Sequence, residues 1–310
     1  MRLPTEPSAP HDAIRVEGLT KRFGRRLAID GASFDVPVGT VTGFVGPNGA
    51  GKSTTLRMLV GLVRPTSGGA AVLGHSIASP GAYLDRVGAL IESPAFYPGL
   101  SGWRNLKVLT TLGRCDRARI EPVLELVGLT ERAHDLYRTY SLGMKQRLGI
   151  AAALLREPEV LILDEPTNGL DPAGIRDMRE LVARIAGSGL TVLVSSHLLA
   201  EVQSVCDWLV IVDRGRLVYE GTTDALLDQG DEGFIVATQD PGELVLVAAL
   251  VSAEGYHAHL EDDHLRIAAP PGFGGELNRM CWEHQIVLTE VTPVRVSLEQ
   301  RFLELTGANS

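Results

Sequence analysis

Residues 46–53 of the sequence have the composition and spacing of a phosphate-binding loop. They read GPNGAGKS, which satisfies the pattern GxxxxGK[ST] between a β-branched run at 41–45 and a periodic segment at 53–60. Glycines let backbone N–H groups curl around a phosphate, and a helix that begins near Lys52 points its positive dipole end at the same anion. Lys52 would then reach the β- and γ-phosphates, while the Ser53 hydroxyl would be a ligand for Mg²⁺.

Two adjacent carboxylates, Asp164 and Glu165, follow an apolar run at 160–163. A carboxylate at the carboxyl end of a buried strand is well placed to hold the Mg²⁺ shell of a nucleotide. Glu165 is the next residue and can polarise an attacking water. A pair of acids after a strand is common for purely structural reasons, so the functional interpretation depends on the phosphate loop upstream.

Three further short motifs occur in a defined order at 140–147 (YSLGMKQR), 168–171 (NGLD) and 195–197 (SSH). Together with the phosphate loop and the acid pair, they resemble the ATP-binding subunits of ABC transporters over about residues 14–222. The resemblance implies an ATPase that uses ATP and Mg²⁺, in which Ser53 and Asp164 organise the metal. It also implies that Glu165 is the general base and that His197 contacts Glu165 and the γ-phosphate.

The same resemblance implies which residues contact ATP. Phe23 matches the aromatic residue that stacks on adenine, and Asp171 matches the loop that links the two nucleotide sites of a dimer. Ser141 and Gly143 would offer a hydroxyl and a backbone N–H to the γ-phosphate held by a partner subunit. The expected ATP-binding set is Phe23, Gly46, Pro47, Asn48, Gly49, Ala50, Gly51, Lys52, Ser53, Thr54, Ser141, Gly143 and Asp171.

The sequence departs from the family's LSGGQ signature at three positions. Tyr140 replaces the leucine, Leu142 replaces the first glycine, and Met144 replaces the glutamine. Because a polar contact from the glutamine is lost, we expect binding across a dimer to be weaker than in the family pattern.

A second departure concerns the glutamine that the family uses in a loop to meet Mg²⁺ and the membrane subunit. No glutamine lies between Ser53 and Lys145, and Glu92 stands at the matching place. A carboxylate is a hard oxygen donor that can serve Mg²⁺, so Glu92 is a candidate metal ligand and a candidate catalytic residue. The alternative is an exposed loop acid with no catalytic role. A glutamate here resembles the branch of the family associated with bacitracin and lantibiotic self-protection.

The pattern becomes strand-like and glycine-punctuated from Ile14, and further along the chain the elements that position these residues alternate. Strand patterns at 41–45, 160–163 and 191–194, with helical patterns at 145–155 and 174–185, predict a parallel α/β sheet of the P-loop NTPase type. We expect a flexible tail at 1–12, a nucleotide-binding domain at 13–223 with a helical subdomain at about 93–155, and an accessory domain at 224–310. In that last domain, strand patterns at 234–238, 258–268 and 285–291, with helical patterns at 242–252 and 275–282, predict a small α+β domain of ferredoxin-like order.

Charge is distributed unevenly over the 310 residues, whose formal net charge is −9. Residues 224–310 hold 15 acidic and four basic side chains, for a charge of −11, whereas residues 1–223 carry +2. This balance argues against a protein that coats nucleic acid, so we expect no nucleic-acid partner. His257, His259, Asp262, Asp263 and His264 are more typical of a solvated face than of a metal site.

The chain has no apolar run of about 18 residues and no signal-peptide pattern, and its three cysteines are scattered, which predicts a reducing cytosol. With the resemblance, this predicts an ATPase on the cytoplasmic face of the cell membrane. It would pair head-to-tail with a second copy of itself and drive a separate transmembrane permease that exports a drug, antibiotic peptide or similar amphiphile.

One alternative is a soluble ATPase of the ABC superfamily with a regulatory or mechanical role. A simple nucleotide kinase would explain the phosphate loop but not residues 141–146 or His197.

Two local structural questions also stay open. The aromatic segment at 95–100 either forms a groove for a helix of the permease or packs under its own domain. A C-terminal helix at 298–306 is expected, with Ser297 as its N-cap.

Overall fold

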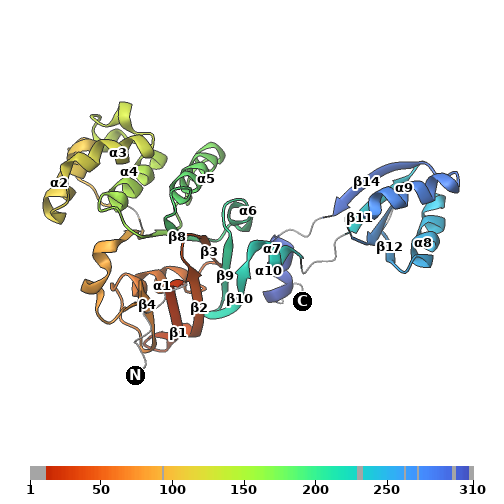
Figure 1. The fold of residues 1–310 in the computed structure, drawn as a ribbon, viewed down its shortest axis with the longest axis horizontal. Helices are drawn as coiled ribbons and strands as arrows, with labels where there is room; N and C mark the ends of the chain where they lie inside the picture. Colours follow the sequence, from red (N-terminus) through yellow and green to blue (C-terminus); the bar gives the residue numbers. More distant parts are fainter. Residues whose placement is uncertain are drawn as a thin grey trace, which may run out of the picture. The chain divides into compact units, whose positions relative to one another are not determined.

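The computed structural model describes residues 12–92, 94–228, 233–261, 263–270, 272–294 and 298–306. The chain divides into two compact units, Met1–Thr223 and Asp224–Ser310 (Figure 1). Of the expected tail at 1–12, Asp12 alone is described, and it is the first residue of a strand. Ser297, the expected N-cap, and Asp262, of the histidine-rich segment, lie outside the described residues.

The main sheet of the first unit is six-stranded, with the order β10-β9-β3-β8-β7-β6. All neighbours pair in parallel except β10, which runs antiparallel to β9 at one edge. The strands are β3 (Val41–Val45), β6 (Val87–Leu90), β7 (Val160–Asp164), β8 (Thr191–Ser196), β9 (Trp208–Asp213) and β10 (Arg216–Thr222). β3 and β7 are buried along their whole length, as expected for strands covered on both faces. The predicted parallel α/β core is confirmed.

A second, antiparallel sheet was not expected from the sequence. Its order is β2-β1-β4-β5, formed by β1 (Asp12–Phe23), β2 (Arg26–Pro37), β4 (Ser67–Val72) and β5 (His75–Ser76). The pairing of β1 with β2 shifts register at four places, including one between Val16 and Leu19. The strand-like pattern from Ile14 is β1, but each shift interrupts the alternation of buried and exposed residues, so the sequence did not indicate how this strand pairs.

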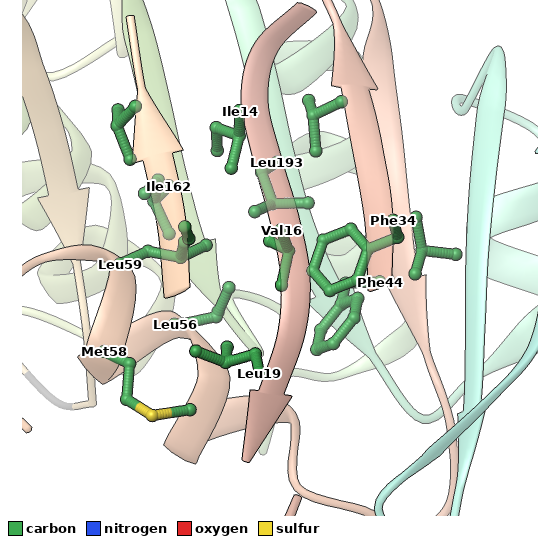
Figure 2. Packing of buried hydrophobic residues seen from close by; sticks show 14 of the residues in the cluster. Ile14, Val16, Leu19, Phe34, Phe44, Leu56, Met58, Leu59, Ile162 and Leu193 are labelled. Carbon is green, nitrogen blue, oxygen red and sulfur yellow. The ribbon is translucent and has the colours of Figure 1, made fainter. Parts of the chain in front are cut away.

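Helix α1 (Lys52–Leu59) lies between the two sheets and joins their cores. Its residues Leu56, Met58 and Leu59 are fully buried. They belong to one apolar cluster with residues of both sheets, among them Ile14, Val16, Leu19, Phe34, Phe44, Ile162 and Leu193 (Figure 2). Burial of each such side chain contributes roughly 1.5–3 kcal/mol. The core therefore fixes the helix that follows the phosphate loop.

The remaining helices of this unit follow the strands. Three of them, α2 (Gly102–Gly113), α3 (Ile120–Leu126) and α4 (Leu142–Leu154), gather into a helical group (Figure 1). α5 (Pro172–Ala186) follows β7, and α6 (Leu199–Gln203) follows β8. The helix expected at 145–155 begins earlier, at Leu142, because the Ser141 hydroxyl accepts a hydrogen bond from the Met144 N–H at 3.3 Å and caps it.

The second unit contains a four-stranded antiparallel sheet with the order β12-β13-β11-β14. Chain order gives β11 (Gly233–Thr238), α8 (Leu244–Ala253), β12 (His257–Glu261), β13 (His264–Ala268), α9 (Phe273–Glu283) and β14 (Leu288–Val294). This is the expected ferredoxin-like order, but the segment expected as one strand at 258–268 is two antiparallel strands. β11 and β14 are neighbours, and Gly233 pairs with Val294. Short helices α7 (Thr223–Asp228) and α10 (Leu298–Thr306) flank these elements along the chain.

The strand expected at 285–291 begins later, at Leu288. Gln285 has a positive φ of 61°, which marks a turn after α9 rather than extended backbone. Among all described residues, no helix combines the length and apolarity needed to cross a membrane.

Candidate functional site

The phosphate loop leaves the carboxyl end of β3 and leads into α1. Gly49 and Gly51 have φ values of 86° and 108°, in the region that favours glycine. A Cβ on Gly51 would also lie 2.6 Å from the Ala28 carbonyl oxygen, and one on Gly46 would clash with the Val212 carbonyl. The loop is therefore a tight turn at a helix N-terminus, where backbone N–H groups and the helix dipole favour an anion.

Lys52 is the buried cation of this loop, with 5% of its side chain exposed. Its Nζ donates to the carbonyl oxygens of Gly46 at 2.6 Å and Pro47 at 3.3 Å. It also lies 3.1 Å from Oε1 of Glu165. The ion pair compensates the charge that burial would otherwise penalise, and it joins the loop after β3 to the end of β7.

β8 lies between β3 and β7, so its carboxyl end lies beside the acid pair. His197 follows β8, and its Nδ1 contacts Oε2 of Glu165. Glu165 thus has one carboxylate oxygen toward Lys52 and the other toward His197. The three residues expected to act on the γ-phosphate and the attacking water come together at one point.

Ser195 is a site residue that the sequence reasoning did not single out. It is fully buried at the end of β8, and its hydroxyl donates to Oδ1 of Asp164 at 2.7 Å. The Ser195 hydroxyl oxygen, Oγ, also accepts a hydrogen bond from the backbone N–H of Glu165 at 2.9 Å. Ser195 therefore orients Asp164 and fixes the backbone of Glu165, which has a positive φ of 48°. The available signal was its place two residues before His197.

We expect Ser195→Ala to destabilise the first unit. The substitution leaves a buried carboxylate oxygen and a backbone N–H without this partner, at a cost of about 1–3 kcal/mol. For a domain of this size, 1 kcal/mol lowers the melting temperature by roughly 2–4 °C. Thermal denaturation checks this, with the exposed Ser67→Ala as the matched control. Equal melting temperatures for the two variants would contradict the assigned role of Ser195.

An open pocket with a volume of about 380 Å³ lies against the loop. It is lined by Phe23, Arg26, Ala28, Asn48, Gly49, Gly51, Lys52, Ser53, Thr54 and Glu165. Its volume is in the range of small-molecule sites. Phe23 is 50% exposed, so its ring is available for stacking, and Lys21 Nζ lies 4.9 Å from the ring centroid.

Arg26 is a second residue that the sequence reasoning missed. The β1–β2 hairpin pairs Phe23 with Arg26 across the turn at 24–25, which brings the guanidinium side chain to the same pocket. The signal was the short glycine-containing turn directly after Phe23. Arg26 adds a cation to the side of the pocket that Phe23 lines.

The donor set of this region suits a phosphate-bearing ligand with a divalent cation. The glycine-bounded loop and Lys52 match phosphate oxygens. The Ser53 hydroxyl and the Asp164 carboxylate are hard oxygen donors, the kind that Mg²⁺ takes. Pro47 and Ala50 close the loop through a hydrogen bond from the Ala50 N–H to the Pro47 oxygen at 3.1 Å.

Ser141, Gly143 and Asp171 do not line this pocket. Ser141 caps α4, and Gly143 lies in the first turn of the same helix. Asp171 caps α5 by accepting a hydrogen bond from the Gly174 N–H at 3.0 Å. These three expected ATP contacts, like Gly46, Pro47 and Ala50 of the loop, are therefore not part of the pocket lining within one chain.

Glu92 is also outside the pocket. It has a positive φ of 65°, its side chain is 66% exposed, and its carboxylate forms an ion pair with Arg57 of α1.

In the aromatic segment at 95–100, Phe96 packs edge-on against Tyr137 with ring centroids 5.2 Å apart, whereas Tyr97 is 61% exposed. Phe96 thus packs within its own domain, and the groove for a permease helix stays a prediction.

Comparison with known proteins gives consistent matches along the chain. The family description "ABC transporter" matches residues 29–168. The ABC transporter ATP-binding protein YhcH of Bacillus subtilis is 41% identical over 302 residues, covering 95% of this chain and 96% of its own. The bacitracin transport ATP-binding protein BcrA of Bacillus licheniformis is 38% identical over 301 residues, covering 96% and 98%.

A solved structure described as an ATP-binding subunit of an ABC transporter is similar in fold. It is 31% identical, with a TM-score of 0.62, and covers 70% of this chain and 92% of that one.

Proposed function

This chain belongs to the family of ABC transporter ATP-binding proteins, and on that premise we propose that it powers the export of a peptide antibiotic or similar amphiphile. It is an ATP-binding subunit that hydrolyses ATP, and subunits of this kind act with a transmembrane permease. Similarity to BcrA over almost the whole of both chains supports a peptide antibiotic as the class of cargo. We place the chain on the cytoplasmic face of the membrane, held there by the permease.

The observation that carries the catalytic proposal is the convergence of Lys52 and His197 on the two carboxylate oxygens of Glu165. Glu165 accepts the proton of the attacking water, and His197 holds the carboxylate in place. Lys52 neutralises charge on the phosphates. Ser53 and Asp164 would hold Mg²⁺, which supplies further charge neutralisation when bound. Ser195 keeps Asp164 and the Glu165 backbone in position.

We further propose that each site is completed by a second copy of the chain. Ser141, Gly143 and Asp171 do not line the pocket of their own chain, which supports this arrangement. Ser141 stands at the N-terminus of a 13-residue helix, where the helix dipole favours an anion. A monomer would then bind ATP and hydrolyse it slowly.

Phe23→Ala should weaken ATP binding without unfolding the protein. Base stacking on an aromatic ring is worth about 1–3 kcal/mol, so we expect the Kd for ATP to rise roughly 5- to 150-fold. Phe23→Trp keeps a stacking surface and serves as the matched control, with an affinity near that of the parent. Isothermal titration calorimetry measures both. An unchanged Kd for Phe23→Ala would remove Phe23 from the adenine site.

The transport role is tested by isolating the chain from membranes of its own host in mild detergent. We expect a membrane protein with about six spanning helices to co-purify. ATP turnover of the reconstituted pair should rise on addition of a peptide antibiotic such as bacitracin. Recovery of the chain with ribosomes, or with no membrane protein at all, would instead favour a regulatory or mechanical ATPase.

A further inference from the structure

Glu92 lies at the carboxyl end of the parallel strands, as the acid pair does. It follows β6, which runs parallel to β7 with Leu90 paired to Leu163, the residue before Asp164. Its backbone has a positive φ of 65°, which is uncommon for a residue other than glycine. That conformation is accompanied by a specific contact, in which Nη2 of Arg57 donates to Oε1 of Glu92.

Arg57 comes from α1, the helix that begins at the phosphate loop. It lies four residues after Ser53, so the two side chains occupy the same helix face about one turn, or roughly 5.4 Å, apart. Arg57 therefore ties the Glu92 carboxylate to the same helix that carries the hydroxyl proposed to bind Mg²⁺.

The contact is of a kind that exchanges easily. The Arg57 side chain is 34% exposed and that of Glu92 is 66% exposed, and such surface ion pairs are weak. Within the described parts of the chain, no other basic side chain forms an ion pair with Glu92. Lys52, at the other end of the same helix, is already paired with Glu165.

We propose that Arg57 is a positioning residue that competes with Mg²⁺ for the carboxylate of Glu92. The inference rests on the proposed role of Glu92 as a metal ligand and adds the group that controls it. In the absence of Mg²⁺, Arg57 keeps a negative charge away from the phosphates. When Mg²⁺ binds with ATP, Glu92 leaves Arg57, whose guanidinium then returns to solvent.

The test is a Mg²⁺ titration of ATP binding, followed by a fluorescent ATP analogue so that turnover is not the readout. Arg57→Gln should lower the apparent Kd for Mg²⁺ by about 1.5- to 5-fold, the range expected for an exposed ion pair. Glu92→Ala should raise that Kd, since it removes the ligand oxygen that a glutamine at this place would keep. In the Glu92→Ala background, Arg57→Gln should have no further effect.

Arg86→Gln is the matched control, because Arg86 also forms an exposed ion pair with a glutamate, Glu159. It should leave the Kd for Mg²⁺ unchanged, and melting temperatures check that every variant is folded. If Glu92→Ala does not alter the Kd, the metal role of Glu92 fails and the inference fails with it. If Glu92→Ala alters it but Arg57→Gln does not, or acts equally in both backgrounds, only the role of Arg57 is overturned. Neither of these two outcomes tests the proposed role of the chain in export.

Discussion

Glu165→Gln should nearly abolish ATP turnover while ATP stays bound. The amide has almost the shape of the carboxylate but cannot accept a proton from water. Loss of a general base typically slows a reaction by about 10²- to 10⁴-fold, and we expect kcat to fall within that range. The ion pair to Lys52 at 3.1 Å disappears as well, which leaves the lysine free for phosphate and supports undiminished ATP affinity.

The trapped state should be visible as a dimer. With ATP and Mg²⁺, Glu165→Gln should elute as a dimer in size-exclusion chromatography with light scattering, whereas the parent should return to monomer as it hydrolyses ATP. Glu159→Gln changes an exposed glutamate and is the matched control, with turnover and elution like the parent. Parent-like turnover in Glu165→Gln would rule out Glu165 as the base.

Lys52→Ala is the second change with a large expected effect, and it should act on binding. Hydrogen bonds to charged groups contribute about 1.5–3 kcal/mol, so we expect the Kd for ATP to rise roughly 10- to 150-fold. Because Lys52 also donates to the Gly46 and Pro47 carbonyls, the loop itself loses an internal support. Calorimetric titration with ATP measures the loss.

Two companions to Lys52→Ala separate charge from fold. Lys107→Ala removes a lysine of α2 and should leave the Kd for ATP unchanged. Lys52→Ala combined with Glu165→Gln removes both members of the ion pair, so no carboxylate is left without its lysine. If the double variant regains stability but not affinity, the lost binding is due to the missing phosphate contact. Parent-like affinity in Lys52→Ala would overturn the role given to Lys52.

The parallel sheet was predictable because its strands are short, aliphatic and buried on both faces. The apolar runs before the phosphate loop and before Asp164 can be predicted as strands from the sequence alone. The ferredoxin-like order was predictable for a similar reason, since strand and helix patterns alternate in the last 87 residues. The acid pair, His197 and Lys52 were predicted because short motifs in a fixed order can be recognised in the sequence without knowledge of the fold.

What could not be predicted depends on contacts between distant segments. The strand-like pattern from Ile14 did not indicate the bulged pairing of β1 with β2, so the second sheet and the place of Arg26 were both missed. Ser195 contacts Asp164 only because β8 inserts between β3 and β7. The partner of Glu92 is 35 residues away along the chain, and no local pattern connects it with Arg57.

The pairing of Gly233 with Val294 brings together the first and last residues of the four-stranded sheet. The polypeptide enters and leaves the four-stranded sheet on adjacent strands, whose backbones are about 4.7–4.9 Å apart. A link of a few residues between Gly233 and Val294 would therefore span the two ends of this sheet, and closing a short link costs little entropy.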